Sequence, residues 1–109
     1  MSIANTPAPP YYAVIFTSTL TADDKGYGKM ADAMERLASE QPGYLGIESA
    51  RGPDGLGITI SYWQDEEALK NWKQVAAHRT AQQLGKDKWY QAYTARVVRV
   101  ERAYGFERD

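Results

Sequence analysis

The chain has 109 residues, of which 43% are hydrophobic and 25% charged, and its formal net charge at pH 7 is -1. This size and composition are typical of one soluble globular domain, and the near-neutral charge argues against binding to nucleic acids or anionic membranes. The absence of cysteine excludes disulfides, thiolate nucleophiles and thiol-ligated metals, and one histidine is too few for an all-protein transition-metal site. We therefore expect no bound metal.

The first ten residues, "MSIANTPAPP", are small, polar and rich in proline, which predicts a flexible arm at 1–10 ahead of a single domain at 11–109. The arm lacks the basic start and apolar core of a signal peptide, and no apolar run reaches the roughly 20 residues that span a bilayer. A cytoplasmic protein without membrane association is therefore expected. The next segment, "YYAVIFTSTL" (11–20), predicts a strand that is apolar on both faces and so covered on both.

A first helix is predicted in the segment that follows, because Met30, Met34 and Leu37 recur at helical spacing. Thr21 has Asp24 three residues later, which resembles a capping box and predicts the helix N-terminus near Thr21. The sequence "PG" at 42–43 ends the helix.

Two short strands are predicted next, at 44–50 and 57–63, because the turn-rich segment "GPDGLG" separates them. A second helix is predicted at 65–85, with Asp65 as its N-cap and Gly85 as its stop. A long last strand with a β-branched centre is expected at 93–106.

This order, β-α-β-β-α-β, predicts an α+β fold of the ferredoxin-like type, with an antiparallel sheet and both helices on one face. The other face must also be covered, because the first strand is apolar on both sides and no element remains to cover it. We therefore predict a homodimer that forms through the sheet face and the last strand, as a dimeric α+β barrel. The arginines of the last strand are assigned to its edge or to this interface: Arg96, Arg99 and Arg102.

The segments "PGYLGIES" and "ISYWQDEEALKNW" resemble the antibiotic biosynthesis monooxygenase (ABM) superfamily of dimeric α+β barrels. In that group a helix ends in P-G-[FY], and the third strand ends in a [YW]-W-x-[SD]-x-E-A segment that opens the second helix. The tail "AHRTAQQLGKDKWYQAYTARVVRVERAYGF" is similar to an uncharacterised branch with H-x-x-A-Q-x-x-G-[RK]-x-x-W-Y before a long last strand. The resemblance covers residues 11–106. Its members include cofactor-free polyketide oxygenases, quinol oxygenases, haem-degrading enzymes and many proteins without known activity.

The resemblance to the cofactor-free polyketide oxygenases carries over only one of three functional positions. Their functional tryptophan ends the third strand, where Trp63 stands. They also use an asparagine four residues before it and a tyrosine six residues after it, where this chain has Thr59 and Leu69. The resemblance therefore implies a role for Trp63 without the accompanying substrate-activating set.

The resemblance to the haem-degrading branch is also incomplete. Trp72 matches the tryptophan that distorts the porphyrin in that branch. The axial histidine of those enzymes falls at Gln82, and their first-strand asparagine falls at Phe16 or Thr17. A haem-binding or haem-degrading protein is thus the third alternative.

Helical geometry places His78, the only histidine, about 120° around the second helix from Trp72, on the flank of the buried face. It is a candidate general base, and the alternative is a solvated or interface histidine. Arg79 projects close to the direction of Trp72, where an unpaired charge is costly to bury. Either the helix breaks near Ala77, which we favour, or Arg79 reaches into a cavity and binds an enolate or carboxylate.

Aromatic side chains could wall a flat apolar cavity between the helices and the sheet, or they could fill the core and the dimer interface. The candidate catalytic residues are His78, as a general base, and Trp63, as the resemblance implies. The candidate substrate-binding residues are Trp72, Arg79, Tyr62, Trp89, Tyr90 and Tyr12.

Two function hypotheses follow. The first is a cofactor-independent monooxygenase, without bound cofactor, that acts on a small aromatic or quinol-type substrate in an apolar pocket. The second is a non-catalytic dimer of the same fold that binds a small hydrophobic ligand or serves as a stress-related protein. The missing family residues favour the second, and the resemblance favours the first.

Overall fold

The computed structural model describes residues 2–82 and 89–108. Six elements follow one another along the chain, alternating as expected from the sequence. They are β1 (Tyr11–Leu20), α1 (Tyr27–Ser39), β2 (Tyr44–Arg51), β3 (Leu56–Trp63), α2 (Glu66–Gln82) and β4 (Tyr90–Val100).

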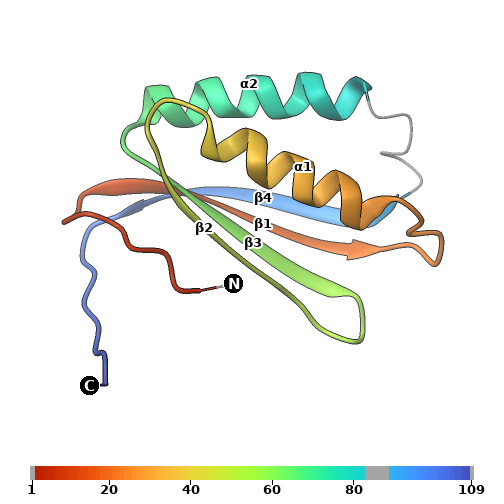
Figure 1. Cartoon of the computed structure of the whole chain (residues 1–109), viewed down its shortest axis with the longest axis horizontal. Helices are drawn as coiled ribbons and strands as arrows, with labels where there is room; N and C mark the ends of the chain where they lie inside the picture. Colours follow the sequence, from red (N-terminus) through yellow and green to blue (C-terminus); the bar gives the residue numbers. More distant parts are fainter. Residues whose placement is uncertain (1, 83–88, 109) are drawn as a thin grey trace.

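The four strands form one sheet in the order β2-β3-β1-β4, and every neighbouring pair is antiparallel. Figure 1 shows α1 and α2 on the same side of this sheet, and the N-terminal arm and the C-terminal segment on the other side. The β-α-β-β-α-β order with helices on one face confirms the predicted ferredoxin-like α+β fold. We call the two faces the helix-side face and the open face.

The register of the central strands decides which side chains share a face. Tyr12 of β1 lies opposite Trp63 of β3. Val14, two residues further along β1, lies opposite Ser61. Directly opposed residues of an antiparallel pair point to the same face. The buried cluster between sheet and helices consists of Ala38, Trp63, Ala68 and Leu69, with Tyr12, Val14, Tyr44 and Trp72 packed against it.

The predicted capping box at the start of α1 is wrong. The helix begins at Tyr27, and its N-cap is Gly26, which has φ 86° and makes no side-chain cap. Thr21 is held elsewhere, because its backbone N–H donates to the carbonyl of Trp89 at 2.8 Å. The Trp89 Nε1 in turn donates to the carbonyl of Lys25 at 2.8 Å. The connection from β1 to α1 is therefore fixed by Trp89, which directly precedes β4 and lies far away in the sequence.

The predicted start of α2 is confirmed, and its predicted break is wrong. The Oδ1 of Asp65 accepts the backbone N–H of Ala68 at 2.8 Å, which is the N-cap bond of this helix. The helix then runs without interruption through Ala77 to Gln82. Gly85, the predicted stop, lies outside the described residues. The unbroken helix leaves the alternative, in which Arg79 reaches into a cavity, and that alternative stays a prediction.

The last strand is shorter and earlier than predicted. It spans Tyr90–Val100, and residues 101–108 are exposed and form no strand. Val100 pairs with Tyr11, where β1 begins. The described strands offer β4 no partner beyond that point, so the β pattern of the sequence continues past the end of the ladder.

The open face is covered at one end by the arm. The Ala4 N–H donates to Glu48 Oε2 at 2.9 Å, and the Thr6 hydroxyl bonds the Tyr11 hydroxyl at 2.9 Å. Tyr11 is consequently only 4% exposed. At the other end of this face Leu56 and Ile58 are 45% and 43% exposed. The predicted homodimer would cover these exposed residues, and it stays a prediction.

Candidate functional site

The helix-side face has two ends that differ in chemistry. We call the first the tryptophan end, formed by Tyr12, Trp63 and Trp72. The Trp63 side chain is fully buried, its ring stacks on Trp72 with centroids 5.6 Å apart at 20°, and its Nε1 donates to Ser61 Oγ at 2.9 Å. Tyr44 meets the same ring edge-on at 5.7 Å. The Trp63 indole is enclosed by these neighbours and presents no surface to a ligand in this arrangement.

We call the opposite end of the same face the tyrosine end, formed by Phe16, Tyr27, Tyr90 and Tyr93. Phe16 stacks on Tyr93 at 5.1 Å and meets Tyr90 edge-on at 5.6 Å. Tyr27, from the first turn of α1, meets Tyr90 edge-on at 5.7 Å. Tyr93 is 49% exposed. This end therefore offers aromatic surface to solvent, which the tryptophan end does not.

Arg51 holds Tyr27, and with it the tyrosine end, in place between the sheet and α1. Arg51, at the end of edge strand β2, lies across Gly57 of β3, where a side chain would collide with the guanidinium. Its Nη2 donates to Ser18 Oγ at 2.8 Å and to the Tyr27 hydroxyl at 3.1 Å, and its Nη1 donates to the carbonyls of Ser18 and Gly55. The guanidinium carbon lies 5.3 Å from the Tyr27 ring centroid. A cation is therefore held between the sheet and α1.

The hydroxyl of Tyr90 is tuned by this environment. Burial raises its pKa above the usual value, and a hydrogen bond to Tyr27 raises it further, while the nearby Arg51 charge acts in the opposite sense. The phenol consequently stays neutral and able to donate a hydrogen bond at ordinary pH. A neutral donor next to a cation is suited to holding an anionic oxygen.

The two polar candidates on α2 lie in different settings. His78 is exposed. Arg79 is half-buried, and its Nε is buried without a hydrogen-bond partner among the described residues. Arg79 follows Trp72 by seven residues, about 10 Å along the helix axis, so it lies toward the tyrosine end. Its donor capacity there is not fully used.

Of the predicted substrate-binding residues, the structure brings together two groups and leaves one apart. Tyr12 joins Trp63 and Trp72 at the tryptophan end. Tyr90 belongs to the tyrosine end, and Trp89, 7% exposed, meets Tyr27 edge-on at 6.2 Å behind it.

Tyr62 is the residue set apart. It pairs with Ala13 in the register, so it lies on the open face, where its hydroxyl donates to Glu48 Oε1 at 2.6 Å. Burial and the Glu48 hydrogen bond raise the pKa of Tyr62. It therefore anchors the region that the arm covers, and it shares no site with the tryptophans.

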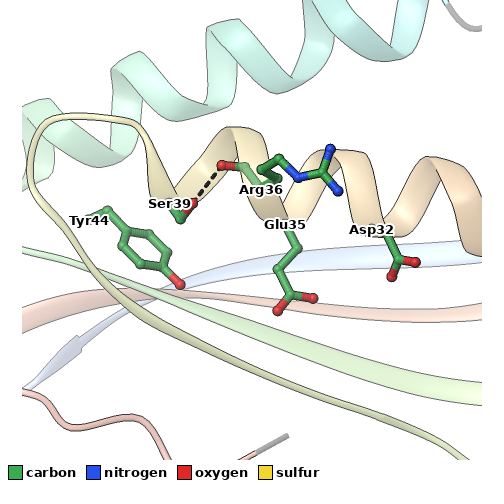
Figure 2. A pocket seen from close by; sticks show the side chains of 5 residues that line it. All are labelled: Asp32, Glu35, Arg36, Ser39 and Tyr44. Atoms are coloured by element: carbon green, nitrogen blue, oxygen red, sulfur yellow. Dashed lines mark hydrogen bonds between the residues drawn. The ribbon is translucent and has the colours of Figure 1, made fainter.

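A hollow of about 320 Å³ lies on the outer side of α1, beside edge strand β2 (Figure 2). Figure 2 shows the Tyr44 hydroxyl and the Glu35 carboxylate turned toward the sheet. Burial raises the pKa of Tyr44, and the Glu35 charge adds to it. The hollow is lined by Asp32, Glu35, Arg36, Ser39 and Tyr44. It is open and carries charges of both signs, so it lacks the apolar walls that an aromatic substrate needs.

The sequence reasoning missed Arg51, Tyr27, Phe16 and Tyr93 as site residues. Arg51 directly precedes the predicted turn segment, so the sequence indicates an ordinary charged residue of a hairpin. The signal in the sequence was Gly57, the first residue of the predicted strand at 57–63, because a glycine in a strand often marks a close approach by another group.

No helix in the described ranges is long and apolar enough to cross a membrane. Within the same ranges, no group of three or more His, Cys, Asp or Glu side chains could hold a metal ion.

The model of the family described as "Antibiotic biosynthesis monooxygenase" (ABM) matches residues 12–84, well over half of the chain. The chain belongs to the ABM family. This confirms the resemblance seen in "PGYLGIES" and "ISYWQDEEALKNW", both of which lie inside the matched range. It places Trp63 and Trp72 on family elements, and it leaves their roles open.

Among proteins of known sequence, the chain is 45% identical over 107 residues to "Uncharacterized protein YqjZ" from Bacillus subtilis (strain 168), covering 98% of this chain and 94% of that protein. It is also 37% identical over 46 residues to "Jasmonate monooxygenase ABM" from Pyricularia oryzae, covering 42% of this chain and 21% of that protein.

Two solved structures show how widely the fold is shared. SnoaB, a cofactor-independent oxygenase from Streptomyces nogalater, superposes with a TM-score of 0.70 at 13% identity, covering 87% of this chain and 97% of that one. Rv0793 from Mycobacterium tuberculosis gives 0.66 at 15% identity, covering 91% and 99%. At such identities the likeness shows the fold alone.

Proposed function

We propose that this ABM-family protein is a cofactor-independent monooxygenase that acts on a small aromatic or quinol-type substrate bound at the helix-side face. The observation that carries the proposal is the tyrosine end, where Tyr93 of β4 is 49% exposed next to an aromatic cluster. On the same face Val97 of β4, opposite Val14 of β1, is 51% exposed. Family membership supports the reaction class. The half-exposed aromatic surface supports a flat ring as the ligand.

In the proposed reaction the substrate supplies the electrons and oxygen is the oxidant. With an anthrone, the deprotonated substrate passes an electron to O₂, the two radicals combine to a peroxide, and loss of water leaves a carbonyl where the anthrone had a CH₂ group. One oxygen atom enters the product and the other leaves as water. The protein contributes desolvation and orientation of the ring, and hydrogen-bond donors for the substrate oxygen.

The test is oxygen uptake with a panel of anthrones and quinols, measured with EDTA present and without added flavin or haem. The wild-type chain should consume one O₂ per substrate oxidised to the carbonyl, and Val97→Arg should abolish uptake by filling the exposed surface. Tyr104→Phe, at a side chain that is 98% exposed, is the matched control and should leave the rate unchanged. No uptake across the whole panel would count against the proposal.

His78, whose side chain is exposed on α2, is proposed as the base that deprotonates the substrate. A base at this position should give a pH–rate profile whose acid limb disappears in His78→Ala. A profile that is the same in the variant assigns deprotonation to solvent and to the acidity of the substrate itself.

The second candidate function is a non-catalytic dimer that binds a small hydrophobic ligand. The closed tryptophan end favours it, because Trp63 is fully buried and hydrogen-bonded and so cannot contact a substrate in this arrangement. Ligand binding without oxygen consumption is the result that selects this alternative.

We also propose that the exposed part of the open face, with Leu56 and Ile58, is covered by a second copy of the chain. Apolar side chains exposed side by side on a sheet face are typical of an interface. The variant Ile58→Asp should convert a dimer to a monomer in light scattering, while Lys70→Asp, at an exposed position of α2 on the opposite side of the sheet, should not.

A further inference from the structure

Arg51, Tyr27 and Tyr90 form a chain of hydrogen-bonding groups at the tyrosine end. The Arg51 Nη2 donates to the Tyr27 hydroxyl at 3.1 Å, and the rings of Tyr27 and Tyr90 meet edge-on with centroids 5.7 Å apart. The three groups come from β2, the start of α1 and the start of β4, so the chain exists only in the folded protein.

The donors of this chain exceed the acceptors within it. Each phenol has one O–H and can accept through its oxygen. The two phenols therefore hold two O–H protons, of which at most one can be donated within the pair. Arg51 supplies a donor and accepts nothing. At least one O–H of the pair can therefore be donated to an acceptor outside the chain of three groups.

The charge around the pair favours an anionic acceptor. The Arg51 guanidinium carbon lies 5.3 Å from the Tyr27 ring centroid, and the Arg51 charge also acts on Tyr90. A donor polarised by a neighbouring cation binds an ionised oxygen more strongly than a neutral one. Tyr93, stacked on Phe16 and 49% exposed, provides a flat surface next to the pair.

We propose that the Tyr27–Tyr90 pair binds the ionised oxygen of a flat aromatic substrate, a phenolate or enolate, whose ring lies against Tyr93. The pair would take the place of the donors that the polyketide oxygenases of the family carry elsewhere, at the positions of Thr59 and Leu69 here. The inference rests on the proposed function for the identity of the site, and it adds the substrate class and the residues that select it.

Two probes that share one ring system test the charge selection. The 2-hydroxy-1,4-naphthoquinone is an anion at pH 7, and 1,4-naphthoquinone is neutral. Binding is measured by quenching of tryptophan fluorescence. The absence of cysteine keeps either quinone from reacting with a thiol. The wild-type chain should bind the anion at least tenfold more tightly, in line with a charge-assisted hydrogen bond.

Hydroxyl deletions show which residues select the anion. Tyr90→Phe and Tyr27→Phe should each weaken binding of the anion by about tenfold and change binding of the neutral quinone by less than about twofold. Because the two phenols act as one unit, the double variant should bind the anion no more weakly than the single variant with the larger loss of affinity. Tyr104→Phe is the matched control and should bind both probes as the wild type does.

Three results would overturn the inference: no binding of the anion by the wild type, equal affinity for the two probes, or equal loss of both in Tyr90→Phe. Circular dichroism of each Tyr→Phe variant shows whether the fold is kept. The proposed function fails separately. If the chain binds the anion selectively and consumes no oxygen, the oxygenase proposal is wrong and anion binding by the Tyr27–Tyr90 pair stands. If Tyr90→Phe consumes oxygen at the wild-type rate, anion binding by the pair is wrong and the oxygenase proposal stands.

Discussion

The two ends of the helix-side face are built from similar aromatic residues and do different things. At the tryptophan end Trp63 is fully buried, stacked on Trp72 and satisfied by Ser61. At the tyrosine end Tyr93 is 49% exposed. The helices explain the difference, because α2 begins over Trp63 while the helix-side residues of edge strand β4 stay exposed beside it. The tryptophan end therefore contributes mainly to the stability of the fold, whereas the tyrosine end has exposed aromatic surface that a ligand could contact.

The largest expected effect is at the tryptophan end. Trp63→Ala removes a fully buried indole and should lower the free energy of unfolding by about 3–5 kcal/mol, since the neighbours only partly fill the space. Urea unfolding followed by circular dichroism measures it. Tyr93→Ala is the matched change at the tyrosine end and should cost less than half as much. Equal losses would show that the two ends are not different in kind.

A smaller effect is expected where Arg51 crosses β3. Gly57→Ala places a methyl carbon 2.6 Å from Nη2 of Arg51, so the guanidinium must leave Ser18 and Tyr27. The lost hydrogen bonds should cost about 1–3 kcal/mol in urea unfolding.

Gly28→Ala is the control for that change, since a Cβ there meets nothing within 4 Å and the residue lies in α1. It should stabilise the chain by about 0.5–1 kcal/mol. If the two variants have the same free energy of unfolding, the Arg51 guanidinium can take another position at no cost. Its contacts with Ser18 and Tyr27 then do not hold the tyrosine end in place.

The N-cap of α2 should contribute about 1 kcal/mol at the tryptophan end. Asp65→Ala removes the acceptor of the Ala68 N–H at 2.8 Å, and thermal unfolding should shift down accordingly. Asp65→Asn keeps a capping oxygen and is the control. Hydrogen exchange should rise first in the turn beside Leu69, and unchanged exchange there would mean that packing on Trp63 alone holds the helix start.

The smallest effect concerns pH and belongs to the tyrosine end. The pKa of Tyr90 is raised above 10.0 in the folded chain, so folding favours the neutral phenol. This stability is fully present below about pH 10 and is lost as the pH rises toward the folded pKa. Urea midpoints measured from pH 9 to pH 11 should fall less steeply in Tyr90→Phe than in the wild type. Identical slopes would place the Tyr90 hydroxyl in open solvent.

The strand and helix pattern was predictable because each element carries its own local signal. "YYAVIFTSTL" is a strand over the predicted residues, and Asp65 caps α2 as expected. The errors lie where partners distant in sequence decide. The start of α1 is set by Trp89 and Gly26, and the end of β4 is set by where β1 begins.

The candidate site was predicted in part for the same reason. Trp63, Trp72 and Tyr90 were named from family spacing and aromatic character, and the structure places them on one face of the sheet. Tyr62 was grouped with them, although the alternation of β3 puts it on the opposite face. Strand alternation was readable in the sequence, so this separation was within reach of it.

The sequence by itself determined the fold class, the family and the aromatic character of the helix-side face, because periodicity and motif spacing are local properties of a chain. Only the tertiary structure decided that Arg51 crosses Gly57 to reach Ser18 and Tyr27. These contacts join three elements, and their cause is the strand order β2-β3-β1-β4, which sets an edge arginine two strands from its acceptor. No spacing along the chain encodes that distance.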